Sequence, residues 1–281
     1  MLEKFKKKLW LAKYYIFNFF LIKLGKHLSL REVSESTEDW QLLKNSLDPK
    51  EINKGIVVVG NGPSLSVQDL EVLQEMPSIA SNKINLLFDS TKWRPSLVTI
   101  CDTLLAYKLR ESHFDGVEKL LCAHTVFYML RGAKGKKLPW KNIPLEEAWL
   151  DYEQNGVFSP DPVNPGLYEG FSITNQNIQL AIWLGAKKIY IIGVDHFYDE
   201  KADAKAGAKM VHEGQNHFHP EYRKKGEIVN NAPIMKMNDA YAKTNAIALS
   251  NGVEVINISR KTGLDVFPKS TVEAVLESMK E

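Results

Sequence analysis

The sequence predicts an α/β fold in which a parallel sheet is flanked by helices. Two observations support it. Short β-branched runs alternate with stretches of helical periodicity, and 281 residues with 44% apolar and 25% charged side chains can bury a large core. This composition excludes a disordered chain, a collagen-like fibre and a disulfide scaffold. Only Cys101 and Cys122 can form a disulfide, so one at most is expected, as in a reducing cytoplasm.

Buried parallel strands are expected where short apolar runs stand between polar turns. Ile56–Val59 is the clearest run, because four β-branched residues in succession suit a strand that is covered on both faces. Further strands are expected near Ile84–Leu87 after Ser81–Asn82, and at Ser96–Ile100, Leu120–Cys122, Ile189–Val194 and Val253–Asn257.

Helices are expected between these strands. Two clear examples, each followed by a glycine stop, are Asn175–Leu184 and Met235–Ser250. Strands separated by helices form a parallel sheet with right-handed crossovers, so we expect a Rossmann-like sheet.

Composition divides the chain into three regions. Residues 1–27 are basic and aromatic, residues 28–54 are polar and are predicted to form a linker, and residues 55–281 hold the predicted sheet. Within the last region, residues 130–170 are rich in proline, and residues 196–232 are rich in lysine and histidine. Both segments are expected to be long lid loops over one end of the sheet.

The amino-terminal region contains an aromatic run. Leu9–Ile22 has one charged residue in fourteen and six aromatic residues, with lysines on both sides. It is too short to span a bilayer, which takes about 20 apolar residues, and no small-residue cleavage site follows it. We expect an amphipathic helix in the membrane interface, with the lysines of residues 1–26 against anionic lipid. The alternative is a helix that packs on the body or on a second subunit, and the oligomeric state stays open.

Charge is unevenly distributed along the chain. The formal net charge is +2, of which residues 1–26 carry +6 and the remainder carries −4. An acidic body argues against nucleic acid as a partner.

Candidate binding groups follow the predicted strands, because ligands of open parallel sheets bind beyond the carboxyl ends of the strands. The turn after the first strand can bring backbone amides close to a phosphate, and it consists of Gly60, Asn61, Gly62, Pro63, Ser64 and Leu65. It is neither a G-x-G-x-x-G fingerprint nor a P-loop, and the alternative is a turn that only packs tightly. The other groups at predicted strand ends are Ser81–Asn82, Asp102, Asp195–Tyr198 and Asn257–Ser259.

A histidine cluster is the second signal. His212, His217 and His219 lie within eight residues, and three interpretations stand beside one another: a solvated loop, a zinc site completed by Asp195 or Glu221, and a general base. We favour the general base, because a neutral imidazole titrates near working pH.

Two absent motifs limit the chemistry. No D-x-D pair occurs, which fits a donor with one phosphate, or one whose charge is met by hydroxyls, amides and lysine, rather than a metal-bound sugar diphosphate. No G-x-S-x-G occurs, which argues against an esterase of the α/β-hydrolase type.

Five segments in a fixed order resemble a known group of proteins: Ile56–Leu65, Ser81–Asn82, Asp102, Gly185–Asp195 and Asn216–Tyr222. They resemble the bacterial CMP-sialic acid sialyltransferases of glycosyltransferase family 42. They also resemble the broader MptE-like group, or domain of unknown function 115, which includes motility-associated flagellin glycosylation proteins. The resemblance covers about residues 55–268 and implies a Rossmann-type variant of the GT-A fold that works without a metal.

The resemblance also implies roles for single residues. Asn61 with its flanking glycines and Asn82 would contact a nucleotide sugar, and Asp102 stands where the sialyltransferases have an asparagine on the donor. His219 matches the presumed base of that family, and His217 matches its first loop histidine. Further donor-binding residues implied by the likeness are Ser172, Thr174, Asp195, Tyr198 and Tyr222.

This chain departs from the sialyltransferase pattern at three places. Gly170 stands where that family has a basic residue, Tyr198 is one residue out of register, and the histidine spacing is H-x-H instead of H-x-x-H. These departures argue against sialic acid as the donor sugar more than they argue against a nucleotide-bound donor.

Three functions follow as hypotheses. The first is a metal-independent glycosyltransferase on the inner face of the bacterial plasma membrane, transferring an acidic sugar from a CMP-activated donor to a glycan acceptor, free or lipid-linked, of lipopolysaccharide or capsule, with a histidine base. The second is an MptE-like 6-hydroxymethylpterin diphosphokinase that uses ATP and Mg²⁺, with Asp102 and Asp195 on the metal. The third is a non-catalytic nucleotide-binding or scaffold protein.

Overall fold

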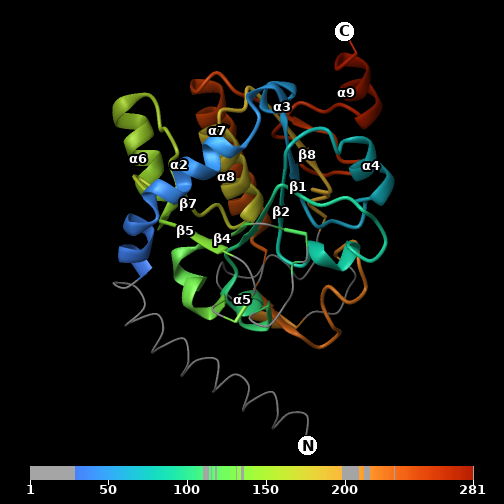
Figure 1. Ribbon diagram of the computed structural model, residues 1–281, viewed down its shortest axis with the longest axis horizontal. Helices are drawn as coiled ribbons and strands as arrows, with labels where there is room; N and C mark the ends of the chain where they lie inside the picture. The colour runs from blue at the N-terminus through green and yellow to red at the C-terminus, as the bar shows by residue number, and fades with distance from the viewer. Residues whose placement is uncertain are drawn as a thin grey trace, which may run out of the picture.

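Seven parallel strands form the central sheet of the computed structural model, within the part of the chain that it describes (Figure 1). That part is residues 29–109, 114, 116–117, 119–130, 132–133, 136–197, 209–211, 216–230 and 232–280. The strands are β1 (Ile56–Val59), β2 (Ser78–Ser81), β3 (Leu97–Ile100), β4 (Lys119–Ala123), β5 (Lys136–Trp140), β8 (Lys188–Ile192) and β11 (Glu254–Asn257). Their order is β11-β8-β1-β2-β3-β4-β5, and every neighbouring pair is parallel. The predicted α/β fold class is confirmed.

Helices cover the sheet on both sides. They include α4 (Val67–Val72), α5 (Thr103–Leu109), α6 (Leu145–Asn155), α7 (Ile173–Leu184), α8 (Ile234–Ser250) and α9 (Val272–Ser278). In Figure 1, α7 and α8 lie together to one side of β1, and α4 lies to the other. The two helices predicted most clearly from the sequence are α7 and α8, and both are confirmed.

The second predicted strand was misplaced. Ile84–Leu87 forms a 3₁₀ turn, and the strand in that part of the sheet is β2, which precedes Asn82. All four residues of β2 are buried, but two of them are serines, so the segment lacks the apolar run that marks the other strands. Asn82 then turns the chain with a φ of +58°.

Helix α7 is buried on every side, from Thr174 to Leu184. Several of its polar side chains form hydrogen bonds inside the protein. Asn175 donates from Nδ2 to the carbonyl oxygen of Gly170 at 2.8 Å and accepts from the Thr244 hydroxyl at 2.6 Å. These bonds fix the chain segment that enters α7.

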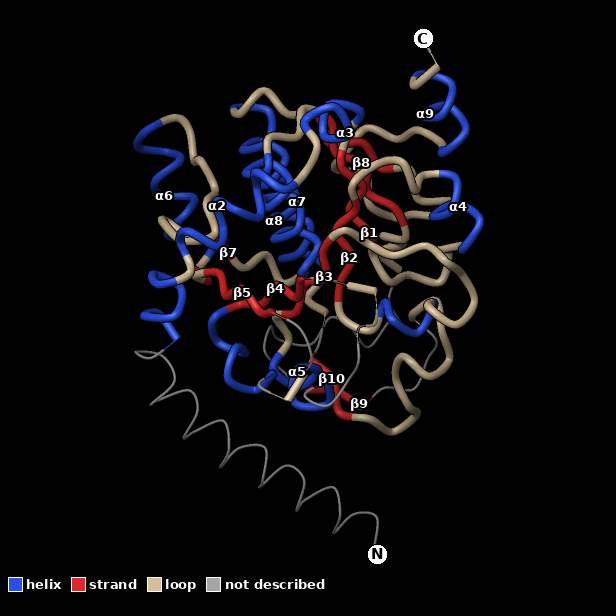
Figure 2. The backbone as a smooth tube through the Cα atoms, in the orientation of Figure 1, coloured by secondary structure: helices blue, strands red, loops and turns tan. Residues whose placement is uncertain are grey.

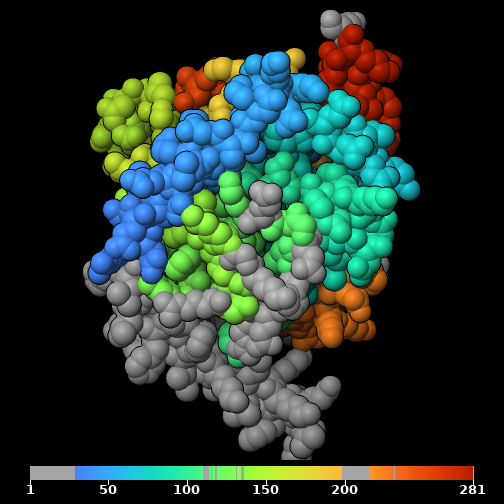
Figure 3. All heavy atoms as spheres, in the orientation of Figure 1, coloured from blue at the N-terminus to red at the C-terminus, as the bar shows by residue number. Residues whose placement is uncertain are grey.

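The predicted linker at residues 28–54 is wrong, as far as these residues are described. Residues 29–35 are helical, and α2 (Thr37–Ser46) and α3 (Pro49–Lys54) follow. Trp40 is fully buried, donates from Nε1 to the Pro139 carbonyl oxygen at 3.1 Å and packs edge-on against Trp183. Figure 3 shows this segment, in blue, lying across the body of the protein. Its buried residues are too widely spaced among charged ones to stand out in the composition.

Most of the predicted lid at residues 130–170 is also wrong. Residues Lys136–Trp140 form β5, the edge strand of the central sheet, and α6 follows it. The short strands β6 (Asn142–Ile143) and β7 (Leu167–Tyr168) pair in parallel and lead the chain back to α7. Proline suggested a loop, yet Pro139 is tolerated because β5 lies at the edge of the sheet.

The predicted lid at residues 196–232 is partly described. It contains β9 (Lys209–Val211) and β10 (Ile228–Asn230), which pair antiparallel apart from the main sheet and lie beside α5 in Figure 2. The amphipathic helix expected within residues 1–27 lies outside the described residues. Among the helices that are described, none is long and apolar enough to cross a membrane.

Candidate functional site

A cavity of about 550 Å³ opens at the switch point of the sheet, beyond the carboxyl ends of β1 and β8. From β1 the strand order proceeds to β2, and from β8 it proceeds the other way to β11, so the two strand ends diverge. Open α/β sheets bind ligands in the crevice at this point. The cavity has the volume of a small-molecule or cofactor site.

The turn after β1 is pressed against the chain that leaves β8. Gly60 and Gly62 donate backbone hydrogen bonds of 2.7 Å to the carbonyl oxygens of Ile192 and Gly193. A Cβ atom on Gly60 would lie 2.4 Å from the Gly193 oxygen, so only glycine fits. The two glycines therefore permit tight packing, and they also line the cavity.

Asp195 also joins the turn after β1 to the chain that leaves β8. Its buried carboxylate accepts from the Ser64 hydroxyl at 2.6 Å and from the Ser64 backbone N–H at 2.9 Å. Asp195 lines the cavity, whereas Pro63 and Ser64 do not. Ser64 thus positions Asp195 instead of facing a ligand.

Two asparagines contribute amide oxygens to the cavity wall. Asn61 donates from Nδ2 to the Ser81 hydroxyl at 2.9 Å, and its backbone carbonyl accepts from the Phe218 N–H at 3.1 Å. The side-chain oxygens of Asn61 and Asn82 are buried and find no hydrogen-bond partner within the described residues. Buried acceptors of this kind are satisfied by a donor from a ligand or water.

Strained backbone gathers at the cavity. Among the described residues, three that are not glycine have a left-handed φ: Asn82 at +58°, Phe171 at +58° and His196 at +56°. All three line the cavity. Such conformations are costly and cluster at functional sites, and a bulky Phe is rarer there than an Asn.

The amino-terminal end of α7 points at the cavity. Ser172 caps the helix by accepting from the Thr174 N–H, and the Tyr241 hydroxyl donates to Ser172 at 3.1 Å. Ser172 and Thr174, for which the likeness implies donor binding, both line the cavity. The helix dipole favours negative charge at this end. No lysine or arginine belongs to the described lining.

The two predicted catalytic histidines are placed differently. His217 lines the cavity and stacks on the buried Tyr222, with ring centroids 3.9 Å apart. His219 does not line the cavity, and its Nδ1 accepts from the Glu221 N–H at 3.2 Å. Tyr222 also lines the cavity, and burial raises the pKa of its hydroxyl. Tyr198 and His212 lie outside the described residues.

His196 is a cavity residue that belongs to the predicted strand-end group Asp195–Tyr198, although it was not proposed as a donor-binding or catalytic residue. Its Nε2 lies 2.7 Å from the Asn238 Oδ1, and its ring packs edge-on against Tyr241. Burial lowers the pKa of His196, although the Asn238 hydrogen bond opposes the shift, so the imidazole is neutral at pH 7. The available signal was its position one residue after Asp195 at the end of a strand.

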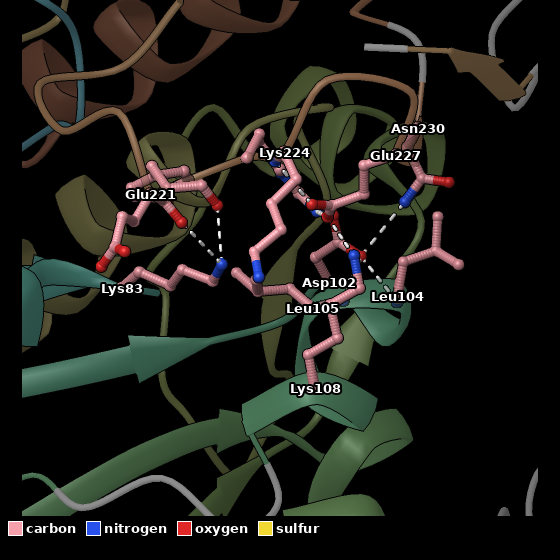
Figure 4. A network of polar contacts seen from close by, with 11 residues as sticks. Lys83, Asp102, Leu104, Leu105, Lys108, Glu221, Lys224, Glu227 and Asn230 are labelled. Carbon is pink, nitrogen blue, oxygen red and sulfur yellow. Dashed lines mark hydrogen bonds and ion pairs between the residues drawn. The ribbon is translucent and has the colours of Figure 1, made fainter.

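Asp102 follows the carboxyl end of β3 and joins the start of α5 to Asn230 of β10 (Figure 4). Its Oδ1 accepts from the backbone N–H groups of Leu104 and Leu105, at 2.7 and 3.1 Å, and from Asn230 at 3.2 Å. Its Oδ2 pairs with Arg223 at 3.5 Å. Asp102 lines the cavity, so the predicted donor contact is compatible with its place, but its oxygens are engaged by the protein.

Glu227 extends this network, which we call the loop anchor (Lys83, Asp102, Lys108, Arg223, Glu227 and Asn230). Burial alone would raise the pKa of Glu227, but hydrogen bonds from Lys108, from the Lys224 backbone and from Arg223 outweigh it and lower the pKa to about 2. Lys83 donates to the carbonyl oxygen of Tyr222 at 2.7 Å. The loop anchor therefore holds residues 216–230, with His217, on the sheet edge.

The two acids proposed for Mg²⁺ are engaged by hydrogen-bond donors of the protein itself. The Asp195 oxygens accept from Ser64, and the Asp102 oxygens accept from three N–H donors and pair with Arg223. These bonds compete with a cation for the carboxylate lone pairs, although Asp195, which accepts two, keeps part of its acceptor capacity. Within the described residues, no group of three His, Cys, Asp or Glu side chains could hold a metal ion, so the zinc interpretation gains no support.

A family model described as "6-hydroxymethylpterin diphosphokinase MptE-like" matches residues 29–201. The chain belongs to this MptE-like family. That part of the resemblance is confirmed, and the likeness to glycosyltransferase family 42 stays a prediction. A comparison with curated proteins gives no match.

One solved structure with a similar fold is the MAf glycosyltransferase from Magnetospirillum magneticum AMB-1. The TM-score is 0.46 and the sequence identity is 16%. The likeness covers 79% of this chain and 34% of that one, so this chain spans about a third of that protein's length.

Proposed function

We propose that this MptE-like protein is a metal-independent glycosyltransferase that uses a CMP-activated acidic sugar. One observation carries the proposal: the turn after β1, the amino-terminal end of α7 and the His217 imidazole meet in a single cavity at the switch point. This arrangement supports adjoining sites for a nucleotide, for its phosphate and for a base that acts on the acceptor hydroxyl.

The charge of the cavity favours a donor with one phosphate. Its described lining contains Asp102, Glu169 and Asp195 but no lysine or arginine. A triphosphate without cations has more negative charge than a phosphate diester with one carboxylate, so it would be repelled more strongly there. A single phosphate diester is favoured by the helix dipole at the start of α7, and it can accept from the Ser172 hydroxyl, whose oxygen only accepts hydrogen bonds within the described residues.

The chemical step would be a displacement at the anomeric carbon. An acceptor oxygen forms a bond to that carbon while the bond from the carbon to the phosphate oxygen breaks. CMP leaves with the electron pair, and the acceptor proton passes to an imidazole of residues 216–222. His217 is the base that the geometry favours, because it lines the cavity; His219 is the one that the resemblance favours.

The alternative is a pterin diphosphokinase, which the description of the family model favours. It would move a diphosphate from ATP and would need Mg²⁺. The engaged carboxylates of Asp102 and Asp195 weigh against it.

A thermal-shift panel tests the two functions. CMP, UDP and ATP would each be added with Mg²⁺ and with EDTA. We expect CMP at about 100 times its dissociation constant to stabilise the protein by about 2.7 kcal/mol in either condition. Ser172→Ala should reduce the CMP shift, and Ser278→Ala, far along the chain on α9, is the matched control. A Mg²⁺-dependent shift with ATP and none with CMP would favour the kinase, and no shift with any nucleotide would favour a scaffold.

We further propose that the enzyme works on the inner face of a bacterial plasma membrane, on an acceptor of a cell-surface glycan such as lipopolysaccharide or capsule. The basic aromatic residues 1–26 support this location. A homo-oligomer is compatible with it.

A further inference from the structure

Two exposed phenylalanines at the cavity each have a lysine ammonium group over the ring. Phe171 is 44% exposed, and the Lys236 Nζ lies over its ring, 5.7 Å from the centroid. Phe197 is 50% exposed, and the Lys261 Nζ lies 5.3 Å from its ring centroid. Both phenylalanines line the cavity, so their exposed rings mark its mouth.

Folding alone does not account for the position of Phe171. Its φ of +58° is unfavourable for a bulky side chain, and its ring is not buried in return. The preceding residue, Gly170, leaves no space for a side chain, because a Cβ there would lie 2.5 Å from the Asn175 side chain. The protein thus holds an apolar ring at the mouth at a cost in backbone energy, which indicates that the ring meets a ligand.

The lysines give the mouth a charge opposite to that of the interior. Lys236 and Lys261 are both exposed, and neither forms an ion pair with an acid among the described residues. The described lining contains the buried Asp195, the half-buried Asp102 and the exposed Glu169, and no lysine or arginine. An anionic ligand is therefore favoured at the mouth and disfavoured deeper in, away from the end of α7.

We infer that the mouth is the acceptor site, and that it takes a saccharide carrying a negatively charged substituent, a carboxylate or a phosphate. The C–H surface of a sugar ring packs on an aromatic face, and the ammonium groups of Lys236 and Lys261 meet the negative group. The name acceptor site rests on the proposed function, whereas the binding of an anionic saccharide does not.

The test compares matched probes by NMR titration at low salt, with and without CMP. Methyl α-glucuronide and glucose 6-phosphate carry the two kinds of anion, and methyl α-glucoside is neutral. We expect each anionic probe to bind about fivefold or more tightly than the neutral one. Lys236→Gln combined with Lys261→Gln should abolish that preference. If only one of the two anions is preferred, that anion is the substituent.

Phe171 variants separate binding from folding. Phe171→Gly relieves the backbone strain, so its melting temperature should equal or exceed that of the wild type while probe binding falls about fivefold or more. Phe171→Trp should keep the binding. The inference is overturned if the neutral probe binds as tightly as the anionic ones, if no probe binds, or if Phe171→Gly binds like the wild type. Anionic saccharides that bind while CMP does not would instead sink the proposed function and leave this site standing.

Discussion

The carboxylate of Asp195 accepts two hydrogen bonds from Ser64, one from the hydroxyl at 2.6 Å and one from the backbone N–H at 2.9 Å. Asp195 follows β8 and Ser64 follows β1, so this pair joins the two chain segments that diverge at the switch point. Gly62 lies directly against the same carboxylate.

Gly62→Ala should destabilise the protein by about 1–3 kcal/mol, because the new Cβ would lie 2.3 Å from the Asp195 Oδ1 and 2.8 Å from the Gly193 carbonyl oxygen. Urea unfolding measures the loss. Gly156→Ala is the control, since its Cβ meets nothing within 4 Å and carries only the strain of a φ of +74°. If both variants lose the same free energy of unfolding, the residues around Gly62 can shift at little cost to make space for the new Cβ.

The sequence predicted the parts of the fold whose signal is local. Ile56–Val59 and the buried helix α7 combine apolar runs with stop residues, so they were found. The strand β5 was missed because edge strands tolerate the proline and the lysines that suggest a loop. Helix α2 was missed because its burial depends on a distant partner, Trp183.

The candidate site was predicted in part for a related reason. Residues after strand ends gather at one edge of a parallel sheet, so Asn61, Asn82 and Asp195 could be grouped in advance. Phe171 could not, because a left-handed φ at an ordinary residue leaves no mark in the sequence. The loop anchor joins Asp102 to Glu227 through Arg223, a tertiary relationship that no local pattern reveals.

Glu227→Gln should lower the free energy of unfolding at pH 7 by about 1–3 kcal/mol, because Lys108 and Arg223 lose their buried partner. The pKa of Glu227 is about 2 in the folded protein and about 4.5 when unfolded, so its contribution is complete above pH 4.5 and is lost as the pH falls towards 2. The difference between wild type and variant should therefore be smaller at pH 3 than at pH 7. Glu35→Gln, at an exposed pair with Arg31, should cost under about 0.5 kcal/mol at both. A wild-type advantage that stays constant with pH would contradict the role of Glu227.

Deleting residues 1–26 should abolish binding to anionic vesicles and leave a folded body. The removed segment carries +6 around an aromatic run, whereas the core residues Val33, Trp40 and Leu43 remain. Vesicle flotation measures binding, and thermal unfolding checks the body. A truncated protein that still floats would place membrane contact elsewhere, and one that cannot fold would mean that the segment packs on the body or on a second subunit.

The histidines give the sharpest test of the proposed mechanism. A base that accepts the acceptor proton in the transition state contributes about 10²- to 10⁴-fold to turnover but little to donor binding. We expect His217→Ala to lower turnover by about 10²-fold or more and to leave the CMP thermal shift nearly unchanged. His219→Ala is the matched variant two residues away, outside the cavity lining. If it is the more damaging of the two, the base is His219, as the resemblance implies.

The pH dependence separates these bases from His196. An imidazole that is protonated cannot accept a proton, so turnover should fall as the pH drops through the pKa of the histidine that serves as the base. Burial lowers the pKa of His196, so a base at His196 would keep turnover high to a lower pH. His196→Ala should change that acid limb only if His196 is the base. If none of the three alanine variants reduces turnover tenfold, no imidazole of this cavity is the base, and the proposed displacement must be assisted in another way.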